Sequence, residues 1–256
     1  MSLKRFFDFR ESRDEAKPFL AHLEDLRMTL IKIAVVLVAT MTLCFAFRRE
    51  LAEIIQHPLI AMDPTRAANL QALGVADSFT ISLELSLYAG IVLAFPFILL
   101  FLAEFVLPAL TSLEKRLLYP VALLGFALFL TGVVFSYFVI LPQALEFFFK
   151  DAKGMHWQPT WTVREYYSFA TQLVLGFGLA FELPLVVLVL VKLGIVDYAL
   201  LKRTRAYALV IIFVIAAIIA PTPDVVTLML MGGPMYVLYE ICIAISWFMG
   251  RPRAGE

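Results

Sequence analysis

The apolar residue types A, V, I, L, M, F, W, Y and C make up 62% of the 256 residues, and charged residues make up only 16%. Too few polar residues remain to shield that much apolar surface from water, which excludes a soluble globular enzyme and a disordered protein. The 21 lysines and arginines balance the 21 aspartates and glutamates, and a net charge of zero argues against nucleic acid as a partner.

Six apolar stretches follow one another along the chain. Their approximate bounds are residues 29–47, 82–107, 117–141, 166–191, 207–220 and 225–249. A helix needs about 20 residues to span a membrane, so four stretches are long enough, the first is nearly so, and the fifth is short unless residues 198–206 extend it. Because lipid cannot satisfy unpaired backbone groups, the stretches are expected to be helices. The sequence predicts an all-α, polytopic membrane protein with six transmembrane helices.

The lysines and arginines between these stretches predict the orientation. If the N-terminus is cytoplasmic, 14 of them lie on the inner side and 6 on the outer side, which is the bias expected of cytoplasmic segments. We therefore expect both termini inside the cell. Residues 1–256 would form one integral membrane domain, with an amphipathic cytoplasmic N-terminus (1–28), a six-helix bundle (29–249) and a cytoplasmic tail (250–256).

Five charged residues fall inside the apolar stretches, where charges are costly and therefore informative. Lys32 is one turn inside the first helix and is expected to reach water by snorkelling. Glu84 and Glu104 lie toward opposite ends of the second helix, so either an interfacial position or a functional role is open. For Glu240, a structural bond between helices and a functional role are equally open. Glu182 lies in the middle of the fourth helix, two residues before a proline. A functional role, with the group either neutral or facing a hydrated cavity, is favoured over a satisfied structural hydrogen bond.

Two carboxylates are predicted on the cytoplasmic side. The amphipathic segment 18–27 places His22 and Asp25 on one helix face, and Glu114 lies in the first inner loop. Asp25 could simply face water, and Glu114 could simply suit the positive end of the next helix. Together, however, they could bind two guanidinium groups through charge-assisted hydrogen bonds.

No catalytic residue, metal site or cofactor is predicted. The three histidines are far apart without metal-ligand spacing, and Cys44 and Cys242 lie in apolar stretches, as buried free thiols do. A phosphate-binding loop is not visible, nor is a protease motif within the helices. The rival from another class is a proton-coupled secondary transporter of a small molecule, with Glu182 as its proton site.

A series of short motifs occurs in a specific order and spacing. The motifs are FLAHLEDLR at 19–27, HPL at 57–59, AFP at 94–96, FVLPAL at 105–110 followed by Glu114, YFV at 137–139, FGLAFELP at 177–184, PD at 223–224 and GPMY at 233–236. With the six-helix layout they resemble the TatC family, the polytopic core of the twin-arginine protein translocase. The resemblance covers nearly the whole chain, from about residue 18 to 249.

The resemblance implies a non-enzymatic receptor with a glove-like bundle in the bacterial inner membrane. Its cytoplasmic face would bind the twin-arginine signal peptides of folded cargo, and export would be driven by the proton motive force. The matching positions are Asp25, Glu114, His22, Leu26, Arg27, Phe105 and Pro108. The family usually has glutamate where this chain has Asp25, which keeps the charge but shortens its reach.

Other matching positions lie elsewhere in the bundle. Pro58 and Phe79 match residues that shape the outer cap, and Glu182 matches the polar group facing the concave hollow. Asp224 and Thr227 match the face used by the single-helix partners TatA and TatB. The family's Thr-Pro-Pro-Asp is here Pro-Thr-Pro-Asp at 221–224, and self-association in a receptor complex is also implied.

Overall fold

The structure is a computed structural model, and it describes residues 19–62, 70–106, 118–157, 160–192, 196–220, 222 and 224–249. Nearly all of this part of the chain is helical. The elements are α1 (Phe19–Ala46), α2 (Arg48–Met62), α4 (Asp77–Val106), α6 (Leu118–Phe135), the π-helical turn η3 (Ser136–Ile140), α7 (Leu141–Gly154), α8 (Val163–Ala180), α9 (Leu183–Lys192), α10 (Tyr198–Arg203), α11 (Arg205–Ile219) and α12 (Val225–Met249).

Five helical segments in the described residues are long and apolar enough to cross a membrane. They cover Leu23–Ala46, Asp77–Phe105, Pro120–Gly154, Val163–Val191 and Val225–Trp247, and the shorter apolar helix α11 makes a sixth. The prediction of an all-α polytopic membrane protein is confirmed. The short fifth stretch is indeed preceded by a helix, since α10 leads almost directly into α11.

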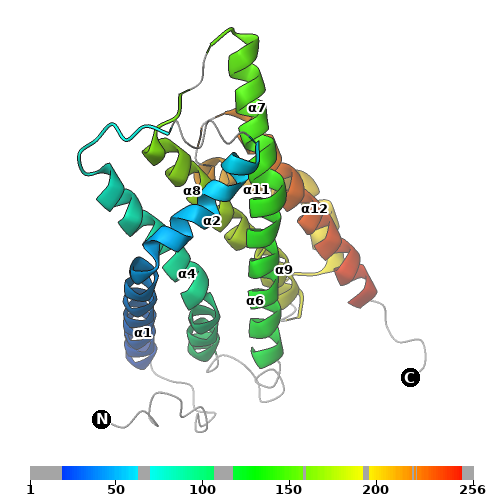
Figure 1. The fold of residues 1–256 in the computed structure, drawn as a ribbon. Coiled ribbons are helices and arrows are strands. Elements are labelled where there is room, and N and C mark those ends of the chain that lie inside the picture. Colours follow the sequence, from blue (N-terminus) through cyan, green and yellow to red (C-terminus); the bar gives the residue numbers. More distant parts are fainter. Residues whose placement is uncertain are drawn as a thin grey trace, which may run out of the picture.

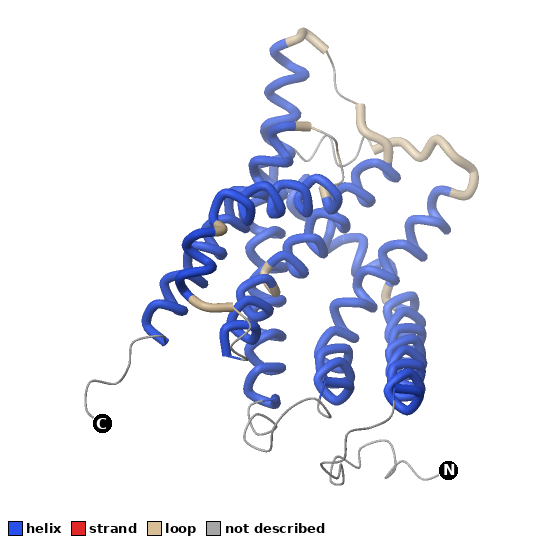
Figure 2. The backbone as a smooth tube through the Cα atoms, turned by 180° about the vertical axis from the view of Figure 1, so that it is seen from behind, coloured by secondary structure: helices blue, strands red, loops and turns tan. Residues whose placement is uncertain are grey.

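The helices stand side by side with one helix lying across them. α1 packs along α4 at one edge, α11 packs on α12 at the other, and α6 and α8 lie between them (Figures 1 and 2). α2 crosses over the bundle toward α7 and α8. α1 begins, α4 ends, α6 begins and α12 ends at the same end of the bundle, at the bottom of Figure 1. We call this the entry end, and the opposite end, which α2 covers, the cap end.

Two glycines allow neighbouring helices to approach closely. A Cβ atom at Gly90 of α4 would lie 2.9 Å from the backbone nitrogen of Met41 in α1. The Thr40 hydroxyl donates to the Gly90 carbonyl at 2.9 Å across the same crossing. A Cβ atom at Gly132 of α6 would lie 2.6 Å from the Phe177 carbonyl oxygen in α8. Small residues at such crossings bring helix backbones together, which is how helices pack tightly in lipid.

Two segments outside the six apolar stretches of the sequence are also helical. α2 occupies residues 48–62, and the third apolar stretch continues through η3 and α7 to Gly154. The fourth stretch, predicted as one helix, is instead broken into α8 and α9 at Phe181 and Glu182. Pro184, which lacks an N–H, is the second residue of α9, a position where that N–H would have no partner in the helix.

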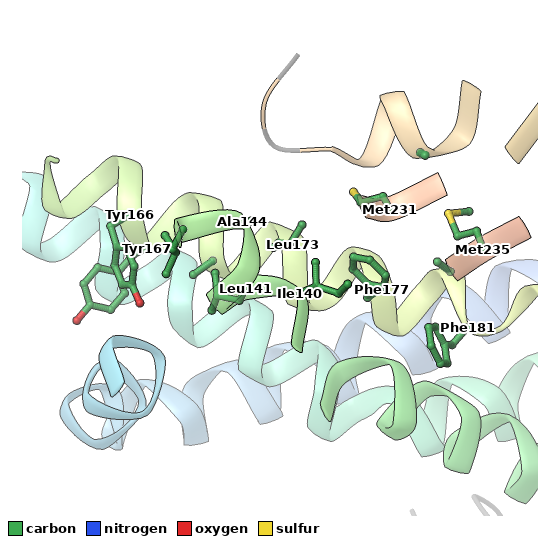
Figure 3. Packing of buried hydrophobic residues seen from close by; sticks show 14 of the residues in the cluster. Ile140, Leu141, Ala144, Tyr166, Tyr167, Leu173, Phe177, Phe181, Met231 and Met235 are labelled. Atoms are coloured by element: carbon green, nitrogen blue, oxygen red, sulfur yellow. The ribbon is translucent and has the colours of Figure 1, made fainter. Parts of the chain in front are cut away.

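The main core lies where α2, η3, α7, α8, α11 and α12 meet. Figure 3 shows residues from several of these elements packed together, including Leu141, Leu173, Phe177 and Met231, all of them fully buried. The predicted burial of the two free thiols is confirmed, with Cys44 4% and Cys242 1% exposed.

Pro58 lies inside α2 and leaves one of its backbone carbonyls without a helical partner. A proline has no N–H, so the Ile54 carbonyl, four residues earlier, cannot form its usual bond. The Tyr137 hydroxyl, from η3, donates to this carbonyl at 2.6 Å. A side chain from another helix therefore replaces the hydrogen bond that the proline removes.

Two further tyrosines hold α2 in the same way. Their rings extend from the first turn of α8 toward α2 in Figure 3. Their hydroxyls donate to α2 carbonyls, Tyr166 to Ile55 at 2.7 Å and Tyr167 to Ala52 at 3.2 Å. We call Tyr137, Tyr166 and Tyr167 the tyrosine clamp. It fixes the crossing helix to the bundle by its backbone.

Candidate functional site

Asp25 lies near the beginning of α1, at the entry end. It is half-buried, and its backbone carbonyl accepts a hydrogen bond from the Thr29 hydroxyl at 2.9 Å. Leu26 is exposed, and Arg27 forms an exposed ion pair with Glu24 at 3.3 Å. His22 belongs to the same helix, although its side chain is outside the described part of the structure. The predicted N-terminal motif is therefore helical, with Asp25 turned more inward than its neighbours.

The second predicted carboxylate, Glu114, lies outside the described residues, and so does Pro108. The helices that flank them are described. Phe105 is half-buried near the end of α4, and both this end and the start of α6 lie at the entry end (Figure 1). The segment carrying Glu114 thus begins and ends on the side where α1 presents Asp25. That Asp25 and Glu114 together bind two guanidinium groups stays a prediction.

Three of the four membrane glutamates have polar partners on another helix. Glu84 of α4 accepts a 2.6 Å hydrogen bond from the Ser168 hydroxyl of α8, and the Gln172 amide donates in turn to Ser168 at 3.2 Å. Glu240 of α12 binds Arg205 of α11 at 2.8 Å. Both contacts join neighbouring helices, which supports the structural interpretation of Glu240.

Lys32 and Glu104 form an ion pair that sequence reasoning missed. The Lys32 ammonium of α1 lies 2.9 Å from Glu104 Oε2 of α4, and both side chains are mostly buried. Lys32 also lies 5.6 Å from the centre of the Phe101 ring. The expectation that Lys32 reaches water by snorkelling stays a prediction; the structure shows its ammonium paired with a carboxylate on the adjacent helix. The sequence offered one lysine and four glutamates inside the apolar stretches, without showing which glutamate pairs with the lysine.

Glu182 differs from the other three glutamates. It lies in the break between α8 and α9, and its Oε1 atom is buried without a hydrogen-bond partner among the described residues. Its Oε2 atom would lie 3.2 Å from a Cβ atom at Gly125 of α6, and the Leu99 side chain of α4 lies equally close to that position. A carboxylate with one buried, unpartnered oxygen can receive a proton or a polar group of a ligand there.

A pocket of about 360 Å³ lies beneath α2. α1, α2, α4, α6, η3 and α8 contribute to its almost wholly apolar walls. The lining residues include Cys44, Ile54, Tyr88, Tyr137 and Val174. Glu182 is not part of this lining. The bundle therefore offers an apolar pocket under the cap and, separately, a lone carboxylate.

The predicted cap residues occupy different environments. Pro58 is buried inside α2, as described above. Phe79, at the start of α4, is 61% exposed and packs edge-to-face on Phe45 of α1, with ring centres 6.2 Å apart. Phe45 in turn lies 4.9 Å from the Arg48 guanidinium. Phe79 therefore packs where α1 turns into α2.

Asp224 caps α12 at the turn after α11. Its carboxylate accepts from the Thr227 backbone N–H at 2.7 Å and from the Thr222 hydroxyl at 2.6 Å. Burial by itself would raise the pKa of this carboxyl, but the hydrogen bonds from Thr222 and Thr227 outweigh burial and lower the pKa below its ordinary value. The Thr227 side chain is fully buried, and its contact with a partner helix stays a prediction.

Comparison with known proteins decides the family. The model of the family described as "Sec-independent protein translocase protein (TatC)" matches residues 21–234. The chain belongs to the TatC family. The match includes Asp25, Glu114 and Glu182, so each lies within the family's common region.

Two named relatives and a solved structure support the same family assignment. TatC of Akkermansia muciniphila is 46% identical over 212 residues, which are 81% of this chain and 61% of that protein's length. TatC of Desulforapulum autotrophicum is 35% identical over 246 residues, 96% of this chain and 90% of that protein. A crystal structure of the twin-arginine translocase receptor TatC, 37% identical, superimposes with a TM-score of 0.81 and covers 90% of this chain and 100% of that one.

The predicted family, fold class and location are therefore confirmed. The protein is a multi-pass component of a Sec-independent protein translocase in the bacterial inner membrane. It is a transport component of a non-catalytic family.

Proposed function

We propose that the entry end binds the twin-arginine signal peptides of folded cargo through Asp25 and Glu114. The observation that supports this most directly is the common placement of the start of α1 with the helix ends that flank residues 107–117 (Figure 1). Two carboxylates on one rim can accept bidentate hydrogen bonds from two guanidinium groups. His22, Leu26, Arg27, Phe105 and Pro108 would line the same site. The entry end would then be cytoplasmic, as the distribution of lysines and arginines predicts.

The remaining parts of the bundle suit the later steps of transport. The apolar part of the signal peptide would enter the hollow near Glu182, whose unpartnered carboxylate oxygen can receive a polar group there. Pro58 and Phe79 would shape the outer cap above this hollow. Asp224 and Thr227 would belong to the face for TatA- and TatB-type single-helix proteins, and copies of the chain would associate in a receptor complex. The proton motive force would supply the energy.

Co-purification tests the proposal. A cargo with a twin-arginine signal should co-purify with the membrane-embedded protein, and its Lys-Lys variant should not. Asp25→Asn and Glu114→Gln together should abolish the difference, because neither neutral side chain offers an anionic acceptor. Equal capture of both cargoes by the wild type would overturn the receptor assignment. Small-molecule uptake by vesicles that contain this protein alone would instead support the proton-coupled transporter.

A further inference from the structure

α1 depends on α4 for its position. It is the least buried of the five long membrane segments, and its main packing partner is α4. Large apolar side chains on its other faces, such as Val35 and Val38, are exposed. The helix that carries Asp25 is therefore located by one interface, and any polar contact within that interface has a large effect on its register.

The Lys32–Glu104 pair lies within this interface. Asp25, Thr29 and Lys32 follow one another at spacings of four and three residues, so they share one face of α1. Thr29 is buried and Lys32 is mostly so, which shows that this face is turned toward the protein. On α4, Glu104 is three residues before Leu107, where the segment that carries Glu114 begins. One ion pair thus joins the helix that bears the first carboxylate to the helix that leads to the second.

Because the ion pair lies between two membrane helices, it opposes movement of α1 relative to α4. Midway along α1, the close crossing at Gly90 and the Thr40 hydrogen bond to the Gly90 carbonyl hold α1 against α4. Toward the entry end, apolar contacts alone would fix the helix less firmly, because lipid tails are as apolar as the side chains they replace. A buried charge must keep its partner, because an unpaired charge in hydrocarbon is costly. The ammonium and the carboxylate are 2.9 Å apart, so a slide or rotation that separates them is opposed. The ion pair therefore fixes the entry end of α1 on α4, beyond what the Gly90 crossing already holds.

We propose that Lys32 and Glu104 are positioning residues for signal recognition. Their ion pair fixes the beginning of α1, and with it Asp25, against the end of α4, the helix that leads to the Glu114 segment. This inference rests on the proposed function of the entry end. It adds two residues that are not themselves expected to touch the signal peptide.

Removal and exchange of the two charges test the proposal. Lys32→Met with Glu104→Gln removes both charges and leaves none unpaired, so the double variant should fold and insert normally. Its affinity for a fluorescent twin-arginine signal peptide should fall about fivefold, the lower end of typical coupling between sites. Lys32→Glu with Glu104→Lys restores an ion pair in reverse and should recover most of the affinity. A matched control is Arg205→Met with Glu240→Gln, which removes the 2.8 Å pair between α11 and α12 and should leave the affinity unchanged.

A distance measurement separates positioning from general loss of structure. Spin labels at the exposed positions Met28 of α1 and Leu102 of α4, in a background without Cys44 and Cys242, report the register of the two helices. The distance distribution should broaden in the neutral pair and narrow again in the exchanged pair.

Each result decides a different point. Unchanged affinity in the neutral pair, or an exchanged pair that stays as weak as the neutral one, would overturn the positioning role. If the wild type binds twin-arginine and twin-lysine peptides equally, the proposed function fails, while the spin-label distances still show whether the pair fixes the register. Should the neutral pair fail to fold, Lys32→Arg alone, which keeps the charge, should retain binding, and its loss would contradict the proposal.

Discussion

Replacement of Tyr137 by phenylalanine tests whether a side chain from η3 replaces the backbone bond that Pro58 removes from α2. The hydroxyl lies 2.6 Å from the Ile54 carbonyl. Without it the carbonyl has neither a helical N–H nor a hydroxyl donor. Hydrogen bonds within membrane proteins average about 0.6 kcal/mol and reach about 1.7 kcal/mol, and this bond lies at the surface of the protein. We expect Tyr137→Phe to lower the free energy of unfolding by about 1 kcal/mol.

The same change should cost much less when residue 58 has an N–H. In Pro58→Ala, the new N–H can donate to the Ile54 carbonyl. Phenylalanine at position 137 then no longer leaves this carbonyl without a hydrogen-bond donor. The loss from Tyr137→Phe in this background should fall below about 0.5 kcal/mol, a coupling of at least about 0.5 kcal/mol in a double-mutant cycle. Unfolding by SDS in mixed micelles, followed by circular dichroism, measures all four proteins.

The control and the refuting result are simple to define. Tyr207→Phe removes a hydroxyl from a side chain that is 73% exposed and should change stability little. If Tyr137→Phe costs the same with proline and with alanine at position 58, the hydroxyl does not replace the missing backbone donor, and the account of the clamp is wrong.

Three further predictions concern contacts between and within helices. Gly132→Ala should destabilise the bundle by about 1–3 kcal/mol, because its Cβ atom would lie 2.6 Å from the Phe177 carbonyl oxygen; unchanged thermal unfolding in detergent would contradict this. Ser168→Ala removes the 2.6 Å donor to Glu84 and should cost about 1–3 kcal/mol, a loss that Ser168→Thr should largely avoid. Asp224→Ala should cost about 1 kcal/mol at neutral pH as a lost helix cap. Because the folded-state pKa of Asp224 lies below its ordinary value of 3.8, that difference is fully present above pH 3.8 and should shrink as the pH falls through the folded-state value; a constant difference would contradict the cap.

Much of the fold could be predicted because membrane helices carry their signal in composition. The stretches that became α1, α4 and α12 were visible as runs of apolar residues, and lipid permits little besides helix for such runs. The extra helices were harder. α2 contains a proline and many charges, and α7 continues a helix beyond its apolar run through a π-helical turn. Both are rich in helix-forming residues such as Leu, Ala and Glu, but neither is a long apolar run, which was the signal that revealed the other helices.

The candidate site was predictable only in part. Motifs located Asp25 and Glu182, and the unpartnered state of Glu182 agrees with the functional role favoured from the sequence. The partners of charged residues could not be read in advance. Lys32 and Glu104 are 72 positions apart, and nothing local indicates that the two meet. A single sequence shows which residues are costly in lipid, but the partners that offset this cost depend on how the helices pack.

The length of α11 has a consequence for the surrounding lipid. Its 15 residues extend about 22 Å at 1.5 Å per residue, while a bilayer's hydrocarbon core is about 30 Å thick. Val210, Val214 and Ile218 of this helix have exposed side chains, which lipid would contact in a membrane. Acyl chains beside it must therefore shorten by tilting or disordering. The bilayer would be thinner along this flank of the protein, and the thickness of the host membrane would affect how well the protein is accommodated.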